Sequence, residues 1–186
     1  MKRLWIWILV MTMLSGCSGE NKEIEQAMAL REKLLNAKGF SFSADITADY
    51  GDKLHLFSMD CQADEEGDLT FTVTKPETIA GITGRIQDEG GELTFDETVL
   101  FFELLTDEQL SPVSAPWILV KTLRSGYLTS ACEEGEGLHL TIDDSYEDDA
   151  LMLDIWLDGK NLPKRAEILY DGRRILTLDV KNAVLS

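Results

Sequence analysis

Hydrophobic and polar residues alternate along most of the chain from residue 40 onward. In FSFSADITADY (residues 40–50), apolar side chains fall on alternate positions and polar ones lie between them. Successive side chains of a β-strand point to opposite faces of a sheet, so this pattern predicts a strand with one buried and one exposed face. The same period recurs in residues 53–63 and 69–73, and Pro76 ends the third segment because proline cannot donate to a strand ladder.

Turn signals separate these segments from later ones of the same kind. The turns are short and contain glycine and acidic residues, and Glu89-Gly90-Gly91 is a tight hairpin signal. Short strands joined by turns at this spacing predict an antiparallel meander with one face buried. The later predicted strands are residues 81–87, 92–96, 137–142, 150–158, 166–171 and 175–180.

Two stretches have helical periodicity instead. The first begins at Asn21, interpreted as an N-cap, and stops at Gly39, a residue type that commonly follows a helix. The second begins at Ser114, has Pro116 in its first turn and stops at Gly126. We interpret the apolar face of the first helix as packed in the core, rather than as the face of a helix that lies on a membrane. The predicted inward residues are Ile24, Ala27, Met28, Leu34 and Leu35 in the first helix, and Trp117, Leu119 or Val120, and Leu123 in the second.

The first sixteen residues have the three parts of a secretory signal. A cationic start (Lys2, Arg3) precedes an apolar run (residues 4–14) and two small residues. The run is shorter than the roughly 18–20 residues that span a bilayer. The order Leu-Ser-Gly-Cys, which ends at Cys17, resembles the bacterial lipobox, whose cysteine sulfur receives a diacylglycerol before the chain is cut in front of it. The alternative is an ordinary signal with a cysteine nearby.

This resemblance predicts the layout and the location of the chain. We expect a signal peptide over residues 1–16, a lipidated tether over 17–20 and a single domain over 21–186. Two or three acyl chains hold a protein on a membrane almost permanently. The predicted location is therefore the extracytoplasmic face of the cell membrane, with the lipid on Cys17 as the membrane partner.

The charge of the chain excludes one class of partner. Without Lys2 and Arg3, 15 of the 17 basic residues remain against 34 acidic ones, which gives a formal charge of −19. So acidic a domain has no electrostatic footprint for nucleic acid. Anionic headgroups also repel it within about 8 Å, the Debye length at physiological salt. The lipid, rather than the protein surface, is expected to hold the chain on the membrane.

The order of elements resembles the LolA/LolB-like lipoprotein-sorting superfamily. The resemblance covers residues 21–183 and is most evident in the closing segment WLDGKNLPKRAEILYDGRRILTLDV, where a tryptophan strand and a turn with Leu162-Pro163-Lys164-Arg165 precede an alternating last strand. It implies an α+β fold, in which an N-terminal helix and an inserted helix lie on the concave side of a strongly curved antiparallel half-barrel. It also implies an apolar cavity between the helices and the sheet.

Large aromatic residues fall on or near these elements. They fill an ordinary core or contact a ligand in the concave face, and truncating a buried aromatic costs roughly 3–5 kcal/mol. Trp156 is a special case, because Leu153 and Ile155 lie on the other side of its strand by parity. The candidate ligand-binding residues are Phe71, Phe95, Phe101, Trp117 and Trp156.

The sequence offers little support for catalysis, and we predict no enzyme activity, no cofactor and no metal. His55 and His139 are the two histidines, each between apolar strand neighbours and without zinc-site spacing. There is no Gly-x-Ser-x-Gly elbow and no glycine-rich phosphate loop. The acidic segment DDSYEDD (residues 143–149) offers oxygen ligands for calcium but lacks the EF-hand spacing, so we favour a solvated turn.

Two cysteines remain after lipidation, Cys61 and Cys132. Outside the cytoplasm such a pair is a disulfide candidate, and closing so long a loop contributes up to about 4 kcal/mol in the chain-entropy model. Two buried thiols, or a bridge between two copies of the chain, are the alternatives.

Two functions follow as expectations. The first is a membrane-anchored lipoprotein that binds a hydrophobic or amphipathic ligand in its concave face. The second is a protein-interaction lipoprotein that docks or activates an envelope enzyme through a sheet edge or the convex face, as in germination lipoproteins that bind a cell-wall amidase.

Overall fold

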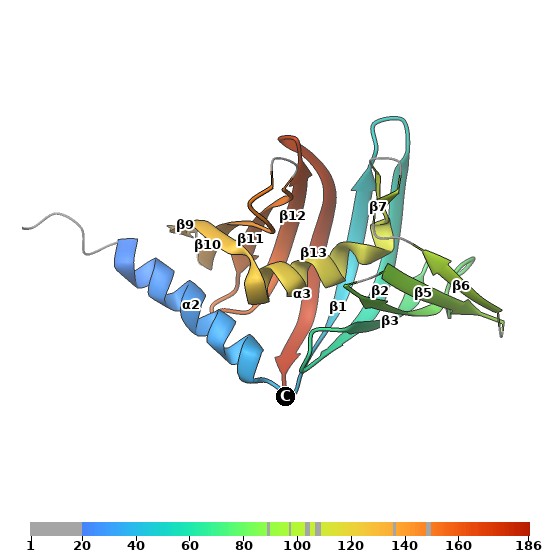
Figure 1. Cartoon of the computed structure of the whole chain (residues 1–186), viewed down its shortest axis with the longest axis horizontal. Coiled ribbons are helices and arrows are strands. Elements are labelled where there is room, and N and C mark those ends of the chain that lie inside the picture. The colour runs from blue at the N-terminus through green and yellow to red at the C-terminus, as the bar shows by residue number, and fades with distance from the viewer. Residues whose placement is uncertain are drawn as a thin grey trace, which may run out of the picture.

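The computed structural model describes residues 20–186, apart from 89, 97, 103–104, 107–108, 136 and 148–149. Its main feature is an antiparallel sheet of 11 strands that bends around one helix, while a second helix lies near one end of the sheet (Figure 1). The elements are α2 (Glu20–Asn36), β1 (Gly39–Asp49), β2 (Leu54–Asp64), β3 (Leu69–Lys75), β4 (Thr83–Gln87), β5 (Gly90–Phe95), β6 (Thr98–Phe102), β7 (Leu105–Thr106), β8 (Gln109–Leu110), a 3₁₀ turn (Pro112–Ser114), α3 (Ala115–Ser125), β9 (Tyr127–Glu134), β10 (Gly137–Asp143), β11 (Met152–Leu157), β12 (Pro163–Tyr170) and β13 (Arg173–Leu185).

The sheet consists of two meanders, β1 to β6 and β9 to β13, that meet at its centre. The strand order is β6-β5-β4-β3-β2-β1-β13-β12-β11-β10-β9, so the first strand pairs with the last. Strands β6 and β9 form the two edges, and the sheet does not close into a barrel. The predicted α+β half-barrel, with an N-terminal and an inserted helix, is confirmed.

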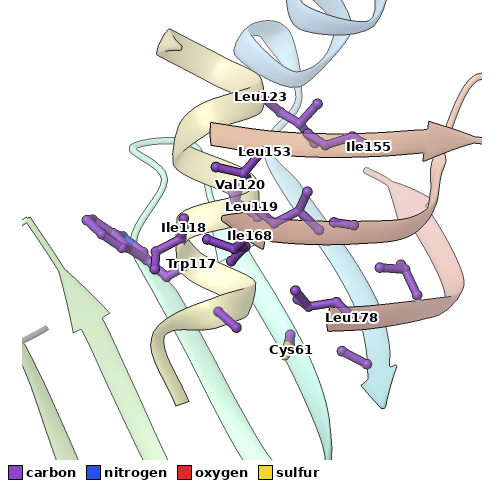
Figure 2. Packing of buried hydrophobic residues seen from close by; sticks show 14 of the residues in the cluster. Cys61, Trp117, Ile118, Leu119, Val120, Leu123, Leu153, Ile155, Ile168 and Leu178 are labelled. Atoms are coloured by element: carbon purple, nitrogen blue, oxygen red, sulfur yellow. The ribbon is translucent and has the colours of Figure 1, made fainter. Parts of the chain in front are cut away.

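Helix α3 fills much of the concave side. Eight of its 11 residues are buried, because nearly the whole helix is enclosed between the arms of the sheet. Figure 2 shows Leu153, Ile155, Ile168 and Leu178 of the strands directed toward the helix, with the indole of Trp117 extending away from them. All these residues belong to one buried cluster that includes both halves of the sheet. The concave side is therefore mostly core.

Helix α2 differs from its prediction in two respects. It begins at Glu20, so Asn21 lies inside the helix and is not the N-cap, and it ends at Asn36, before Gly39 starts β1. The buried face of the helix is also rotated relative to the predicted one, because α2 packs against β9 and α3 and the residues on that side become buried. Ala27, Leu30 and Leu34 are buried, whereas the predicted inward residues Ile24, Met28 and Leu35 are exposed.

Two arginines join the helices to each other. Arg31 of α2 donates from Nε to Leu123 O (2.9 Å) and from Nη2 to Gly126 O (2.6 Å) at the end of α3. Arg124 of α3 donates in return to Leu34 O (3.0 Å). Each guanidinium therefore satisfies carbonyls at the carboxyl end of the other helix, where backbone acceptors lack intrahelical partners. Partial burial lowers the pKa of Arg31.

Candidate functional site

The five predicted ligand-binding residues do not lie at one site. Phe71 on β3 and Trp117 on α3 are core residues on the concave side. Phe95 on β5 and Phe101 on β6 lie at the far edge of the sheet, and Phe101 is 82% exposed. Trp156 is half-buried on the convex face of β11, opposite the buried Leu153 and Ile155, so the parity prediction for this residue is confirmed.

A pocket of about 250 Å³ lies beside Trp117 on the concave side. Its apolar walls come from elements far apart in the sequence, and it is smaller than the roughly 300–1,000 Å³ typical of small-molecule sites. A pocket of this size accommodates one chain or ring of a ligand rather than a whole lipid. The lining residues are Asp88, Leu110, Trp117, Ile118, Lys121, Thr122, Asp144, Ser145, Leu151 and Tyr170.

Polar groups lie at the rim of this pocket. Lys121 Nζ is 3.1 Å from Asp88 Oδ1 and 4.6 Å from the centre of the Trp117 ring, so one ammonium makes an ion pair and a cation–π contact. Asp144 Oδ1 accepts a hydrogen bond from the Leu151 backbone N–H (2.8 Å). The rim therefore carries two carboxylates and one cation over an apolar interior.

Thr122 supplies the one unusual polar group of the pocket. Its side chain is only 1% exposed, and its Oγ1 has no hydrogen-bond partner among the described residues. A threonine inside a helix commonly donates to the carbonyl four residues earlier, which this one does not do. A buried hydroxyl without a partner costs roughly 1–3 kcal/mol, so such a group at a pocket calls for an explanation.

Strand β6 forms a second candidate surface. It is an edge strand whose side chains are exposed on both faces of the sheet, with Leu100 60% exposed on one face and Phe101 on the other. This explains why residues 98–102 lack alternation and were not predicted as a strand. Beside Phe101, a shallow pocket of about 430 Å³ on the convex face is lined by Arg85, Gln87, Gly90, Gly91, Glu92, Phe101 and Phe102.

The predicted internal disulfide is absent from the structure. Cys61 is buried on β2 and Cys132 is exposed on β9, and both are free thiols. Five strands lie between β2 and β9 in the sheet, whereas a disulfide requires the two Cα atoms within about 7 Å. The alternative of two buried thiols also fails for Cys132. Burial raises the pKa of the Cys61 thiol well above its ordinary value.

The remaining sequence candidates fall in different places. Cys17 lies outside the described residues. Asp144 and Ser145 of the acidic segment hold their own turn through backbone N–H groups, and within the described ranges no three His, Cys, Asp or Glu residues come together as a metal site. None of the described helices is long and apolar enough to cross a membrane. Sequence reasoning missed Lys121 and Thr122, although Lys121 follows Trp117 and Thr122 follows Ile118 by four residues, which is one turn of α3.

No family model and no curated protein matches the sequence. Among solved structures, the chain is similar to an uncharacterized conserved protein from Thermus thermophilus, with 11% identity, 88% of this chain and 87% of that chain covered, and a TM-score of 0.48. A putative outer membrane lipoprotein-sorting protein domain from Vibrio parahaemolyticus is 9% identical, with 90% of this chain and 94% of that chain covered and a TM-score of 0.49. A LolA superfamily protein from Nitrosomonas europaea is 9% identical, with 86% of this chain and 93% of that chain covered and a TM-score of 0.45. Two of these three proteins are a lipoprotein-sorting domain and a LolA superfamily protein, the family that the sequence resembles.

Proposed function

We propose that this chain is a lipid-anchored extracytoplasmic protein that binds an amphipathic ligand in the pocket beside Trp117. The apolar part of the ligand lies against Trp117, Leu110 and Leu151, and its polar head lies at the rim. The observation that carries the proposal is the hydroxyl of Thr122, which is buried at an apolar pocket without a partner among the described residues. A ligand group that donates to or accepts from this hydroxyl removes the cost of burying it.

The charges of the chain favour some polar heads of the ligand over others. The formal charge is −17, and Asp88 and Asp144 outnumber Lys121 at the rim. An anionic head is repelled by this surface, whereas a neutral or cationic head is not. We therefore propose a single-chain amphiphile with a neutral or cationic head as the ligand class.

Calorimetric titration tests the pocket. Residues 20–186 contain the whole described core, and this segment is titrated with monodecanoylglycerol (neutral), dodecyltrimethylammonium (cationic) and decanoate (anionic), all below their micelle concentrations. We expect saturable binding of the first two and binding of decanoate at least about tenfold weaker. Equal binding of all three, or none, contradicts the proposal.

The lipid anchor is tested separately at Cys17. The full-length chain is expressed with labelled palmitate, as wild type and as Cys17→Ser. We expect the label on the wild type and its loss from the variant, because two or more acyl chains on this sulfur and the new amino end provide the anchor. Equal labelling of both chains would exclude Cys17 as the lipid attachment site.

A second candidate function is supported by strand β6. This five-residue apolar edge strand presents unpaired backbone N–H and C=O groups to another chain. From Ile86 to Val120 the sequence has no lysine or arginine, and it has eight acidic residues, namely Asp88, Glu89, Glu92, Asp96, Glu97, Glu103, Asp107 and Glu108. This charge disfavours a second copy at the edge. It favours an extended segment of another protein in which apolar and basic residues alternate.

Binding of a designed strand tests this second function. An acetylated Lys-Val-Lys-Val-Lys-Val-Lys peptide is titrated against the full-length chain in zwitterionic nanodiscs. Phe101→Thr is expected to weaken binding about tenfold, since the ring is lost from the contact while strand propensity is kept. Tyr146→Thr is the matched control, because Tyr146 is 81% exposed and lies between β10 and β11. Equal loss in both variants, or equal binding of the Glu-Val analogue of the peptide, contradicts docking at β6.

A further inference from the structure

A cysteine, a histidine and an aspartate meet on the convex face near the β9 edge. In the strand register, Cys132 of β9 lies opposite His139 of β10. The Cys132 Sγ is 3.9 Å from His139 Nδ1, and His139 Nε2 is 3.1 Å from Asp154 Oδ1 on β11. Cys132 is exposed, so its sulfur is accessible from solvent. The three strands thus place a nucleophile, a base and an orienting carboxylate in contact.

The imidazole of His139 is held in this orientation from several sides. The Trp156 ring stacks on it with centroids 4.6 Å apart and planes 10° from parallel. Trp156 Nε1 donates to Glu134 Oε2 (3.0 Å), and that oxygen lies 3.4 Å from His139 Nδ1. Thr141 Oγ1 donates to Asp154 Oδ1 (2.9 Å), which fixes the carboxylate that orients the ring. Trp156 is therefore part of the support of His139.

These contacts favour one placement of the protons. An ionised Asp154 can only accept, so a neutral imidazole at His139 places its hydrogen on Nε2 and directs its Nδ1 lone pair to the side of the Cys132 thiol. Transfer of the thiol proton to Nδ1 gives a thiolate beside an imidazolium, and Asp154 and Glu134 both face that cation. Arg165, 5.9 Å from the Trp156 ring, and Glu167, opposite Asp154 in the strand register, are further charged groups on this face. An exposed cysteine beside a protonated histidine is the environment of reactive thiols.

We propose that Cys132 is an activated thiol that exchanges with a disulfide of another molecule, with His139 as its base and Asp154 as a positioning residue. The thiolate attacks one sulfur of the disulfide, the S–S bond breaks, and a mixed disulfide forms on Cys132. The other sulfur leaves as a thiolate and takes up the proton from His139 Nδ1. The incoming disulfide is the oxidant and the Cys132 thiol is the reductant, so the step needs no further reactant.

The product of this step is expected to persist. A mixed disulfide is released when a neighbouring thiol attacks it, and Cys61 is buried on β2, with five strands between it and β9. The described part of the chain therefore offers no resolving thiol. The site is suited to covalent attachment of a disulfide-bearing molecule at the convex face, and it is independent of the pocket beside Trp117.

Reaction with 4,4′-dithiodipyridine, an uncharged disulfide, tests the proposal. The full-length chain in nanodiscs is mixed with the reagent, and the trace of Cys132→Ser is subtracted to isolate Cys132 from Cys17 and Cys61. At about pH 7 we expect His139→Gln to react about tenfold more slowly than wild type. Above about pH 9, where an ordinary thiol is largely ionised, we expect the two rates to converge.

The pH profile separates activation from a structural effect. Asp154→Asn keeps an acceptor for Nε2 but removes the charge that faces the imidazolium, and we expect its rate to rise at a pH between those of wild type and His139→Gln. A wild-type rate equal to that of His139→Gln at about pH 7 overturns the proposal. A pH dependence of the wild-type Cys132 rate that coincides with that of glutathione also overturns the proposal. A rate difference that persists unchanged at high pH assigns the effect to access and also overturns it.

Discussion

Lys121 Nζ on α3 and Asp88 Oδ1 after β4 lie 3.1 Å apart at the rim of the pocket. This contact joins the inserted helix to the β4–β5 turn, and the same ammonium lies over the Trp117 ring. The side chains are 44% and 80% exposed, so the pair contributes little to stability. Its position beside the pocket makes it a determinant of which ligand head is accepted.

Lys121→Met is predicted to change head-group preference rather than stability. Methionine retains an apolar stem over Trp117 but leaves Asp88 without its cation. We expect dodecyltrimethylammonium to bind roughly three- to tenfold more tightly, monodecanoylglycerol to bind as before, and stability to change by less than about 1 kcal/mol. Lys160→Met, in the exposed turn between β11 and β12, is the control. Calorimetric titration measures these affinities. An equal gain in affinity for dodecyltrimethylammonium in the control would show that Lys121 does not determine head-group preference at the rim.

Thr122→Val is predicted to have opposite effects on stability and on binding. Valine keeps the branched shape and removes the buried hydroxyl, which has no partner among the described residues. We expect the free energy of unfolding to rise by about 1 kcal/mol and the affinity for monodecanoylglycerol to fall about tenfold. Urea unfolding and calorimetry measure the two quantities. A variant that is both less stable and equally able to bind shows that the hydroxyl is satisfied within the protein.

Gly84→Ala is predicted to destabilise the arm of the sheet that carries β6. A Cβ on Gly84 lies 2.5 Å from the Phe71 ring and 2.6 Å from Glu92 O, and the backbone of β5 cannot move without disturbing the ladder. We expect a loss of about 1–3 kcal/mol. Gly159→Ala is the control, since nothing lies within 4 Å of its Cβ, and we expect a change within about 0.5 kcal/mol. Urea unfolding of both variants makes the comparison.

Glu167 is expected to cause part of the loss of stability of the fold in acid. Burial tends to raise its pKa, but hydrogen bonds from Arg165 (2.7 Å) and Arg174 (3.1 Å) outweigh burial and hold the pKa below the ordinary value of 4.5. A carboxylate with a lowered folded-state pKa contributes stability above its unfolded pKa, and this contribution is lost as the pH falls through the folded pKa.

The matching experiment compares wild type with Glu167→Gln from about pH 7 to about pH 3 by urea unfolding. We expect wild type to be more stable at neutral pH and the difference to shrink below about pH 4.5. Relief of the general acidic repulsion affects both chains equally and cancels. A difference in stability that stays constant across this range would show that the arginines do not act through the charge of Glu167.

The period of two was sufficient to predict most of the sheet, because one face of each strand is buried and the other is exposed. Strand β6 was missed since both of its faces are exposed and Thr98–Phe102 shows no alternation. The stripe of α2 was misplaced because two adjacent faces of that helix are apolar. Burial against β9 and α3 selected Leu30 and left Met28 exposed.

The candidate sites could be predicted less well than the fold. Trp117 was predicted to face inward, and it does, but the pocket also needs Asp88 and Tyr170, whose proximity depends on the curvature of the sheet. Cys132, His139 and Asp154 come together only through the register of three strands. Local sequence around each residue contains no signal for that register.

In the proposed complex a ligand chain lies against Trp117. Quenching of tryptophan fluorescence by a monoacylglycerol brominated at the end of its chain, measured on residues 20–186, tests this contact. Trp156→Phe leaves Trp117 as the fluorophore, and Trp117→Phe leaves Trp156 on the opposite face. We predict saturable quenching in Trp156→Phe and none in Trp117→Phe. Equal quenching in the two variants, or an unquenched Trp117 at saturating ligand, would contradict the account.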